Sequence, residues 1–316
     1  IVTLHGAGTT AAHQVDWWAG ERTENGMRLG QAGRHGYIVV APMWTTEHQA
    51  RYEYSLHEHL AVLNAVRDAC RRFSIDTDRM FLSGHFMGAD AAWDIGLANP
   101  SMWAGVIPIC GRSDRYCSFY WPNAKLLPLY VVLGELDGSL LKDNSRDLDR
   151  CLRAASPTIV VEYLGRGREN FSDEILRIFD WMGHQQRIAF PQEFEAVTMR
   201  EWDDRFWYVQ VEGLPPAIAS DPALWPPRSP RTLKITGSRP SSTSNKLYVR
   251  AGASLATVWL SPELINFEER FSVMLNGRTI DSRDVSPSIA TILEDVRLRG
   301  DRLHPFWAKV EVGTSR

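Results

Sequence analysis

The segment DRMFLSGHFMGADAAW, residues 78–93, decides the fold of this chain. A short apolar run at 80–82 ends in small residues and passes directly into a helical pattern, which predicts a strand, a sharp turn and a helix. The turn has the glycine spacing of the G-x-S-x-G nucleophile elbow, because Gly84 and Gly88 stand where a Cβ would crowd a neighbouring element. The position of the serine holds Phe86, whose ring has no proton to lose and no lone pair with which to attack.

Apolar runs alternate with helical patterns on either side of this segment. Helical spacing of apolar residues extends over 53–73 and over 87–99. Runs typical of buried parallel strands lie at 1–4, 36–42 and 105–111, and further strand-like runs lie at 129–134 and 158–163. This alternation predicts right-handed βαβ units and a doubly wound parallel sheet.

The character of the sequence changes after Pro191. Residues 195–213 alternate in polarity and are rich in aromatic residues and valine, and short strand-like runs follow a Pro/Ser-rich passage at 215–230. Asn276-Gly277 between two such runs predicts a two-residue β-hairpin. We therefore predict two domains, an α/β domain at 1–191 and a small, mostly β, sandwich-like domain at 192–316.

The charge balance argues against a nucleic acid as partner, because the 316 residues carry a net charge of only −3. No apolar run reaches the roughly 18 residues that a membrane-spanning helix needs. The chain opens at Ile1 inside a strand-like run, so we expect N-terminal strands of the sheet to be missing from this sequence. Neither the cellular compartment nor the oligomeric state can be predicted.

The four cysteines show no C-x-x-C or zinc-type spacing. We expect buried thiols, with a disulfide between Cys110 and Cys117 as the alternative. The segment His57-Glu58-His59 is not the H-E-x-x-H motif, since residues two apart on a helix point to different faces. No metal and no cofactor is predicted.

Five segments, in this order, resemble the α/β-hydrolase superfamily, in particular the bacterial esterase and peptidase branch near dienelactone hydrolases, polyhydroxybutyrate depolymerases and prolyl-oligopeptidase catalytic domains. They are LHGAG (4–8), DRMFLSGHFMGADAAWDIGLANP (78–100), VIPICG (106–111), LPLYVVLGELDGS (127–139) and YLGRGRENFSDEILRIFDWM (163–182). The C-terminal region is similar to a β domain appended to some bacterial members. The resemblance implies an α/β-hydrolase fold and a small ester- or peptide-like ligand.

The resemblance also implies where a catalytic triad would lie. The family order is nucleophile, acid and histidine, and the matching positions here are Phe86, Asp137 and Arg168. The oxyanion hole would use the backbone N–H groups of Gly6, Ala7 and Met87, which do not depend on the side chain at position 86.

Further polar and aromatic residues close to these motifs are candidates for the pocket. His85 adjoins the elbow, Asp90 lies one turn beyond it and Glu169 follows the histidine position. His5 precedes the glycine turn, and Trp121 lies in a predicted loop near the mouth of the site, as do Trp17 and Trp18.

Both reactive members of the triad are substituted. Arg168 cannot act as a base, because a guanidinium stays protonated at any working pH, but it can pair with Asp137 as a structural ion pair. We therefore predict a pseudohydrolase that acts in ligand binding or protein interaction. The alternative is an active esterase or peptidase with displaced catalytic groups, for which His85, Asp90, Asp137 and Glu169 are the residues at hand.

Overall fold

The computed structural model describes residues 1–153, 157–241 and 244–313. The chain divides into two compact units. The first comprises Ile1–Leu97 and Met102–Arg187, and the second comprises Ala98–Ser101 and the residues from Ile188 onward.

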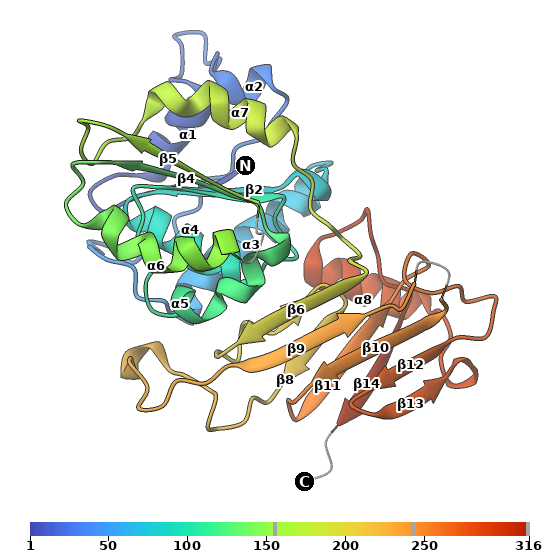
Figure 1. The fold of residues 1–316 in the computed structure, drawn as a ribbon. Coiled ribbons are helices and arrows are strands. Elements are labelled where there is room, and N and C mark those ends of the chain that lie inside the picture. Colours follow the sequence, from blue (N-terminus) through green and yellow to red (C-terminus); the bar gives the residue numbers. More distant parts are fainter. Residues whose placement is uncertain (154–156, 242–243, 314–316) are drawn as a thin grey trace. The chain divides into compact units, whose positions relative to one another are not determined.

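The first unit is built on a parallel sheet of five strands in the order β1-β2-β3-β4-β5. All residues of the four strands from β1 to β4 are buried, as expected for parallel strands covered on both faces. Helices lie on both faces of the sheet (Figure 1). The strands are β1 (Val2–Leu4), β2 (Phe81–His85), β3 (Gly105–Ile109), β4 (Leu129–Gly134) and β5 (Thr158–Tyr163).

The helices divide into two groups. In Figure 1, α1 (Ala11–Ala19), α2 (Gln31–Arg34) and α7 (Ile175–Gly183) cover one face of the sheet. The other face carries α3 (Leu56–Arg72), α4 (Met87–Ala98), α5 (Cys117–Tyr120) and α6 (Leu140–Arg153). Short 3₁₀ segments lie at Thr77–Arg79, Trp121–Leu126 and Ser172–Glu174. The sheet order, the helices on both faces and the strand–turn–helix at β2 and α4 confirm the predicted α/β-hydrolase core.

The predicted buried strand at 36–42 is wrong in its burial and in its length. Only Val40 forms a β-bridge, to Val2, and the side chain of Ile38 is 43% exposed. Hydrogen bonds link this segment to β1 on one side, from Val40 N–H to the carbonyl of Ile1 (2.8 Å) and from Thr3 N–H to that of Val40 (2.9 Å). No described strand pairs with its other side, so the apolar run lies at an edge of the sheet.

The second unit is a sandwich of two sheets, as predicted. One sheet has the order β13-β12-β10-β9-β6 and the other β14-β11-β8-β7. The strands are β6 (Glu193–Thr198), β7 (Arg205–Phe206), β8 (Val209–Glu212), β9 (Leu233–Ser238), β10 (Lys246–Ala251), β11 (Leu255–Leu260), β12 (Ser272–Leu275), β13 (Arg278–Asp281) and β14 (Ala308–Gly313). Pairing is antiparallel except between β10 and β12.

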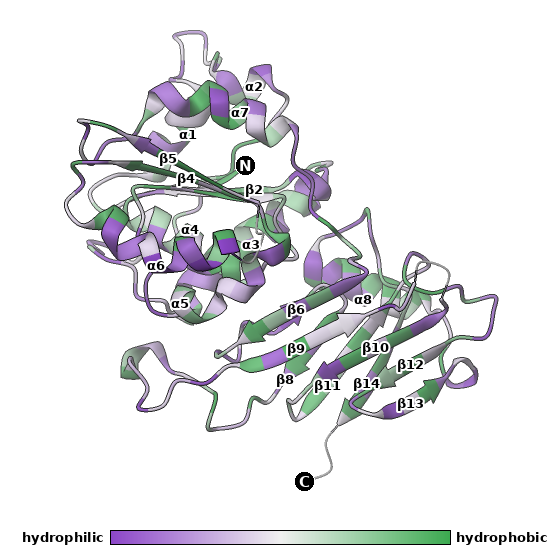
Figure 2. Ribbon diagram, in the orientation of Figure 1, coloured by the Kyte–Doolittle hydropathy of each residue, from purple (hydrophilic) through white to green (hydrophobic). Residues whose placement is uncertain are grey.

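The core of the second unit lies between these sheets. Burial alternates along β9, β10 and β14, and hydrophobic and hydrophilic residues alternate along the same strands in Figure 2. The ring of Phe194 on β6 contacts Trp207 (4.7 Å between centroids) and Tyr208 (5.1 Å), which lie between β7 and β8. The predicted hairpin joins β12 to β13, with Asn276 (φ 53°) and Gly277 (φ 82°) both in the left-handed region.

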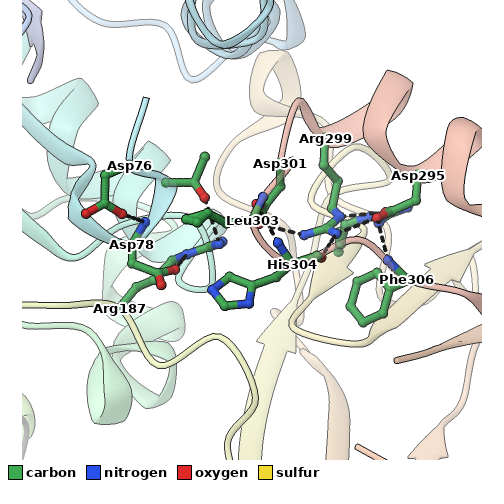
Figure 3. A network of polar contacts seen from close by, with 11 residues as sticks. Asp76, Asp78, Arg187, Asp295, Arg299, Asp301, Leu303, His304 and Phe306 are labelled. Atoms are coloured by element: carbon green, nitrogen blue, oxygen red, sulfur yellow. Dashed lines mark hydrogen bonds and ion pairs between the residues drawn. The ribbon is translucent and has the colours of Figure 1, made fainter. Parts of the chain in front are cut away.

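Two ionic contacts show how charged side chains are paired within each unit. In the first, the guanidinium of Arg187 donates to Asp78 (Nε to Oδ1, 2.9 Å), which ties the end of the unit to the segment before β2 (Figure 3). In the second, the fully buried Asp295 on α8 (Ile289–Arg299) accepts hydrogen bonds from Arg299 and from Phe306 N–H at 2.9 Å (Figure 3). A buried carboxylate needs such partners to offset the loss of its hydration.

The alternative disulfide is not formed. Cys70, Cys110, Cys117 and Cys151 are all buried thiols, and no disulfide occurs among the described residues. Within the same residues, no group of three or more His, Cys, Asp or Glu side chains is placed to hold a metal ion. No helix there is both long and apolar enough to cross a membrane.

Candidate functional site

The elbow between β2 and α4 has the backbone geometry that the glycine spacing predicts. Phe86 has a φ of 57°, a conformation that a bulky side chain rarely adopts. Its N–H donates to the carbonyl of Ile109 (3.0 Å), and its own carbonyl accepts from the N–H groups of Ala89 and Asp90. These bonds hold a strained residue at the end of the strand, and strain of this kind is typical of functional positions.

Two glycines make this turn possible. A Cβ on Gly84 would lie 2.1 Å from the carbonyl oxygen of Gly88, and a Cβ on Gly88 would lie 2.1 Å from that of Leu4. Both distances are far below van der Waals contact, so no other residue fits at either position without moving the backbone.

The ring of Phe86 lies between the glycine turn after β1 and the loop after β5. A Cβ built on Gly6 would come within 3.2 Å of Cβ and Cδ2 of Phe86, so the phenyl group lies directly beside this turn. Beside the same ring lies the guanidinium of Arg168, with its Cζ 4.9 Å from the ring centroid. The positions predicted for nucleophile and histidine are thus in contact, as a cation–π pair.

Asp137 follows β4, and its surroundings differ from the expectation. The hypothesis that it pairs with Arg168 is wrong, because the two side chains form no ion pair and Arg168 lies over Phe86 instead. The Asp137 Oδ2 atom is buried and has no hydrogen-bond partner among the described residues. Cys110 is its neighbour: burial raises the pKa of this thiol to about 12, and the Asp137 carboxylate adds to the effect.

His85 is buried behind the elbow and has partners on both ring nitrogens. Nδ1 lies 3.1 Å from Oε1 of Gln14, and Nε2 lies 3.2 Å from the carbonyl oxygen of Asn170. Burial lowers the pKa of His85 to about 4, against a smaller upward effect of the Asn170 carbonyl. The imidazole is therefore neutral at neutral pH, so it carries one N–H and donates to only one of these two oxygens.

Asp90 and Glu169 both have polar partners. Asp90 Oδ1 accepts from the N–H of Arg112 (2.6 Å), while burial raises the pKa of its carboxyl to about 7, against the lowering effects of that hydrogen bond and of Arg168. Glu169 accepts from Nη2 (2.5 Å) and Nε (3.0 Å) of Arg166. The Arg166 hydrogen bonds lower the pKa of Glu169.

The remaining candidates are His5, Trp121 and the three backbone donors proposed for the oxyanion hole. His5 Nδ1 is 3.2 Å from the carbonyl oxygen of Gly6, and its ring packs 5.8 Å from that of Trp44. Trp121 begins the 3₁₀ segment Trp121–Leu126. The backbone N–H groups of Gly6, Ala7 and Met87 donate to no acceptor among the described residues, the state that an oxyanion hole requires.

A cavity of about 530 Å³ opens beside Phe86, at the carboxyl ends of the strands. Of the predicted residues, Trp17, His85, Phe86, Arg168 and Glu169 line it. His5, Gly6, Ala7, Trp18, Met87, Asp90, Trp121 and Asp137 do not. The remaining lining residues are Thr9, His13, Gln14, Asp16, Glu21 and Asn170.

Half of the lining residues that were not predicted lie in α1, as Trp17 does. The sequence-based prediction placed Trp17 and Trp18 in a loop, but both lie in this helix. The sequence signal for the start of this helix is a capping box. The Thr10 hydroxyl accepts from the N–H of His13, and the Nδ1 atom of His13 accepts from the N–H of Thr10. It is hard to read from the sequence because histidine replaces the usual Glu or Gln of such a box.

No family model matches the sequence, and no curated protein matches it either. Among solved structures, a thermostable esterase is similar at 21% identity and a TM-score of 0.45, over 59% of this chain and 54% of that one. S-formylglutathione hydrolase from Staphylococcus aureus is similar at 17% identity and 0.45, over 57% and 79%. Fluorophosphonate-binding serine hydrolase F from the same organism is similar at 15% identity and 0.46, over 57% and 82%.

Proposed function

We propose that this chain is a pseudohydrolase: a protein with the α/β-hydrolase fold that has lost acyl transfer and binds a small-molecule ligand beside the former nucleophile position. The observation that supports this most is the contact of Phe86 with Arg168. One residue replaces the nucleophile, the other replaces the base, and the two side chains are in contact with each other. A hydroxyl activated by a neighbouring imidazole has no equivalent in this arrangement.

The arrangement of the cavity supports the same reading. The ring of Phe86 packs beside Gly6, and none of the three proposed oxyanion donors lines the cavity. A ligand in the cavity therefore contacts Phe86 before it can reach those N–H groups. Stabilisation of an oxyanion requires N–H donors about 2.7–3.1 Å from the oxygen. The ring of Phe86 prevents a ligand in the cavity from coming this close to the three N–H groups.

Displaced catalytic groups have less support. Both ring nitrogens of His85 face oxygen atoms of Gln14 and Asn170, and the Asp90 carboxyl lies outside the cavity. The nearby thiol of Cys110 stays protonated because burial raises its pKa to about 12, and a thiol is a far poorer nucleophile than a thiolate.

Covalent labelling tests the proposal. We expect the unmodified protein, incubated with a fluorophosphonate, to keep its intact mass, because no activated hydroxyl or thiol faces the cavity. A known serine esterase labelled in parallel controls for the reagent. One adduct per chain, lost in the Asp137→Asn variant, would show a working triad with another nucleophile and refute the proposal.

We further propose that the two units are separate domains and that the boundary between them in the sequence lies near residue 191. The Pro/Ser-rich passage 215–230 then belongs to the second domain. The second function that we propose for the pseudohydrolase fold is interaction with another protein. No nucleic-acid partner is proposed, because the chain has a small negative net charge.

A further inference from the structure

The cavity beside Phe86 contains one cationic side chain whose charge is not paired. Arg168 is exposed and forms no ion pair with a described carboxylate. The acidic residues around it differ in this respect. Asp16 pairs with Arg28, and Glu169 pairs with Arg166, and neither of those arginines lines the cavity.

Two other carboxyl groups bear on this balance. Glu21 also lines the cavity, and because it is exposed, as Arg168 is, water screens both charges. Asp90 interacts with Arg168 at long range but lies outside the cavity, and its pKa of about 7 leaves it partly protonated at neutral pH. What sets Arg168 apart from Glu21 is that its guanidinium is fixed in place over the ring of Phe86.

The contact with Phe86 fixes this guanidinium without using its donors. An arginine over an aromatic face interacts through its π surface, while the N–H groups around its edge remain able to donate. Two parallel N–H groups of this kind match the two oxygens of a carboxylate. Arg168 thus presents a carboxylate receptor above the ring of Phe86.

The rest of the lining includes an apolar surface. Trp17 is held by a hydrogen bond from its indole N–H to the carbonyl of Asn170 (3.1 Å) and by an edge contact with His85 at 4.9 Å. Its ring and that of Phe86 both line the cavity. A volume of about 530 Å³ accommodates a small organic molecule.

We propose that this cavity binds a small organic carboxylate, with its charged group on Arg168 and its apolar or aromatic body against Trp17 and Phe86. This ligand class rests on the proposed function: a pseudohydrolase would bind the free carboxylic acid at this site, whereas an active hydrolase would bind the corresponding ester. A neutral ester of the same shape lacks the charge that Arg168 recognises, so the site discriminates between the two.

Calorimetric titration of the unmodified protein with benzoate, methyl benzoate and benzylamine tests this. We expect saturable binding of benzoate, and at least roughly tenfold weaker binding of the neutral ester and the amine, because a hydrogen bond to a charged group contributes about that factor. Arg168→Gln should weaken benzoate binding by a similar factor. Arg153→Gln, which alters an exposed arginine paired with Asp149 on α6, is the matched control and should change nothing.

Other outcomes would overturn the inference. If benzylamine binds as tightly as benzoate, or if benzoate binding survives Arg168→Gln, then Arg168 does not bind the carboxylate and the proposal is refuted. Inorganic phosphate binding as tightly as benzoate would show that the apolar walls do not contribute. Hydrolysis of methyl benzoate during the titration would refute the pseudohydrolase itself, whereas the absence of both hydrolysis and benzoate binding would refute only the carboxylate ligand.

Discussion

The double substitution Phe86→Ser with Arg168→His is expected to raise the hydrolysis of p-nitrophenyl acetate by about 10²- to 10³-fold over the unmodified protein. Loss of a triad nucleophile or base typically lowers turnover by about 10⁶-fold. A restored triad recovers only part of this loss when the residues around it do not hold the catalytic groups in the productive geometry. The backbone at position 86 already has the φ of 57° that presents a nucleophile. The buried, unpartnered Oδ2 of Asp137 is available to accept from an imidazole N–H.

The single variants are the controls for this experiment. Phe86→Ser alone supplies a hydroxyl without a base, and Arg168→His alone supplies a base without a nucleophile, so each should remain near background. Adding Asp137→Asn to the double variant should abolish the gain, because the imidazole then loses the carboxylate that orients it. A double variant that folds normally yet gains nothing would show that the frame around the elbow is not competent for acyl transfer.

Gly88→Ala is expected to destabilise the first unit by more than about 3 kcal/mol, since the added Cβ would lie 2.1 Å from the carbonyl oxygen of Leu4 and must displace backbone. For a unit of this size, such a loss lowers Tm by roughly 6–12 °C. Thermal unfolding followed by circular dichroism measures it. Gly33→Ala is the matched control, because a Cβ there meets no atom within 4 Å, and it should leave Tm unchanged or slightly raised. Equal Tm values for the two variants would contradict the close packing of the elbow against β1.

The fold of the first unit could be predicted because its signals are local. The apolar runs of β2, β3 and β4 are buried on both faces and read as continuous hydrophobic segments, and two glycines mark the turn after β2. The segment 36–42 has the same composition but lies at an edge. Composition alone does not distinguish a central strand from an edge strand, because the difference depends on which other segments pair with it.

The site was predictable in its positions and less so in its contacts. Phe86, Asp137 and Arg168 follow β2, β4 and β5, so each lies beyond the carboxyl end of a strand of the same parallel sheet. The direction of the Arg168 side chain depends on its rotamer and on the loop after β5, so its contact with Phe86 could not be foreseen. The same holds for His85, whose ring is held by Gln14, 71 residues away, and Asn170, 85 residues away.

The most direct test of the central claim is the kcat/KM of the unmodified protein for p-nitrophenyl acetate, measured beside the Asp137→Asn variant. We predict that both are indistinguishable from an equal concentration of an unrelated protein, because the nucleophile and histidine positions of the triad are occupied by Phe86 and Arg168. Saturable turnover by the unmodified protein that disappears in Asp137→Asn would contradict the account, since it would mean that the acid still serves a working catalytic relay.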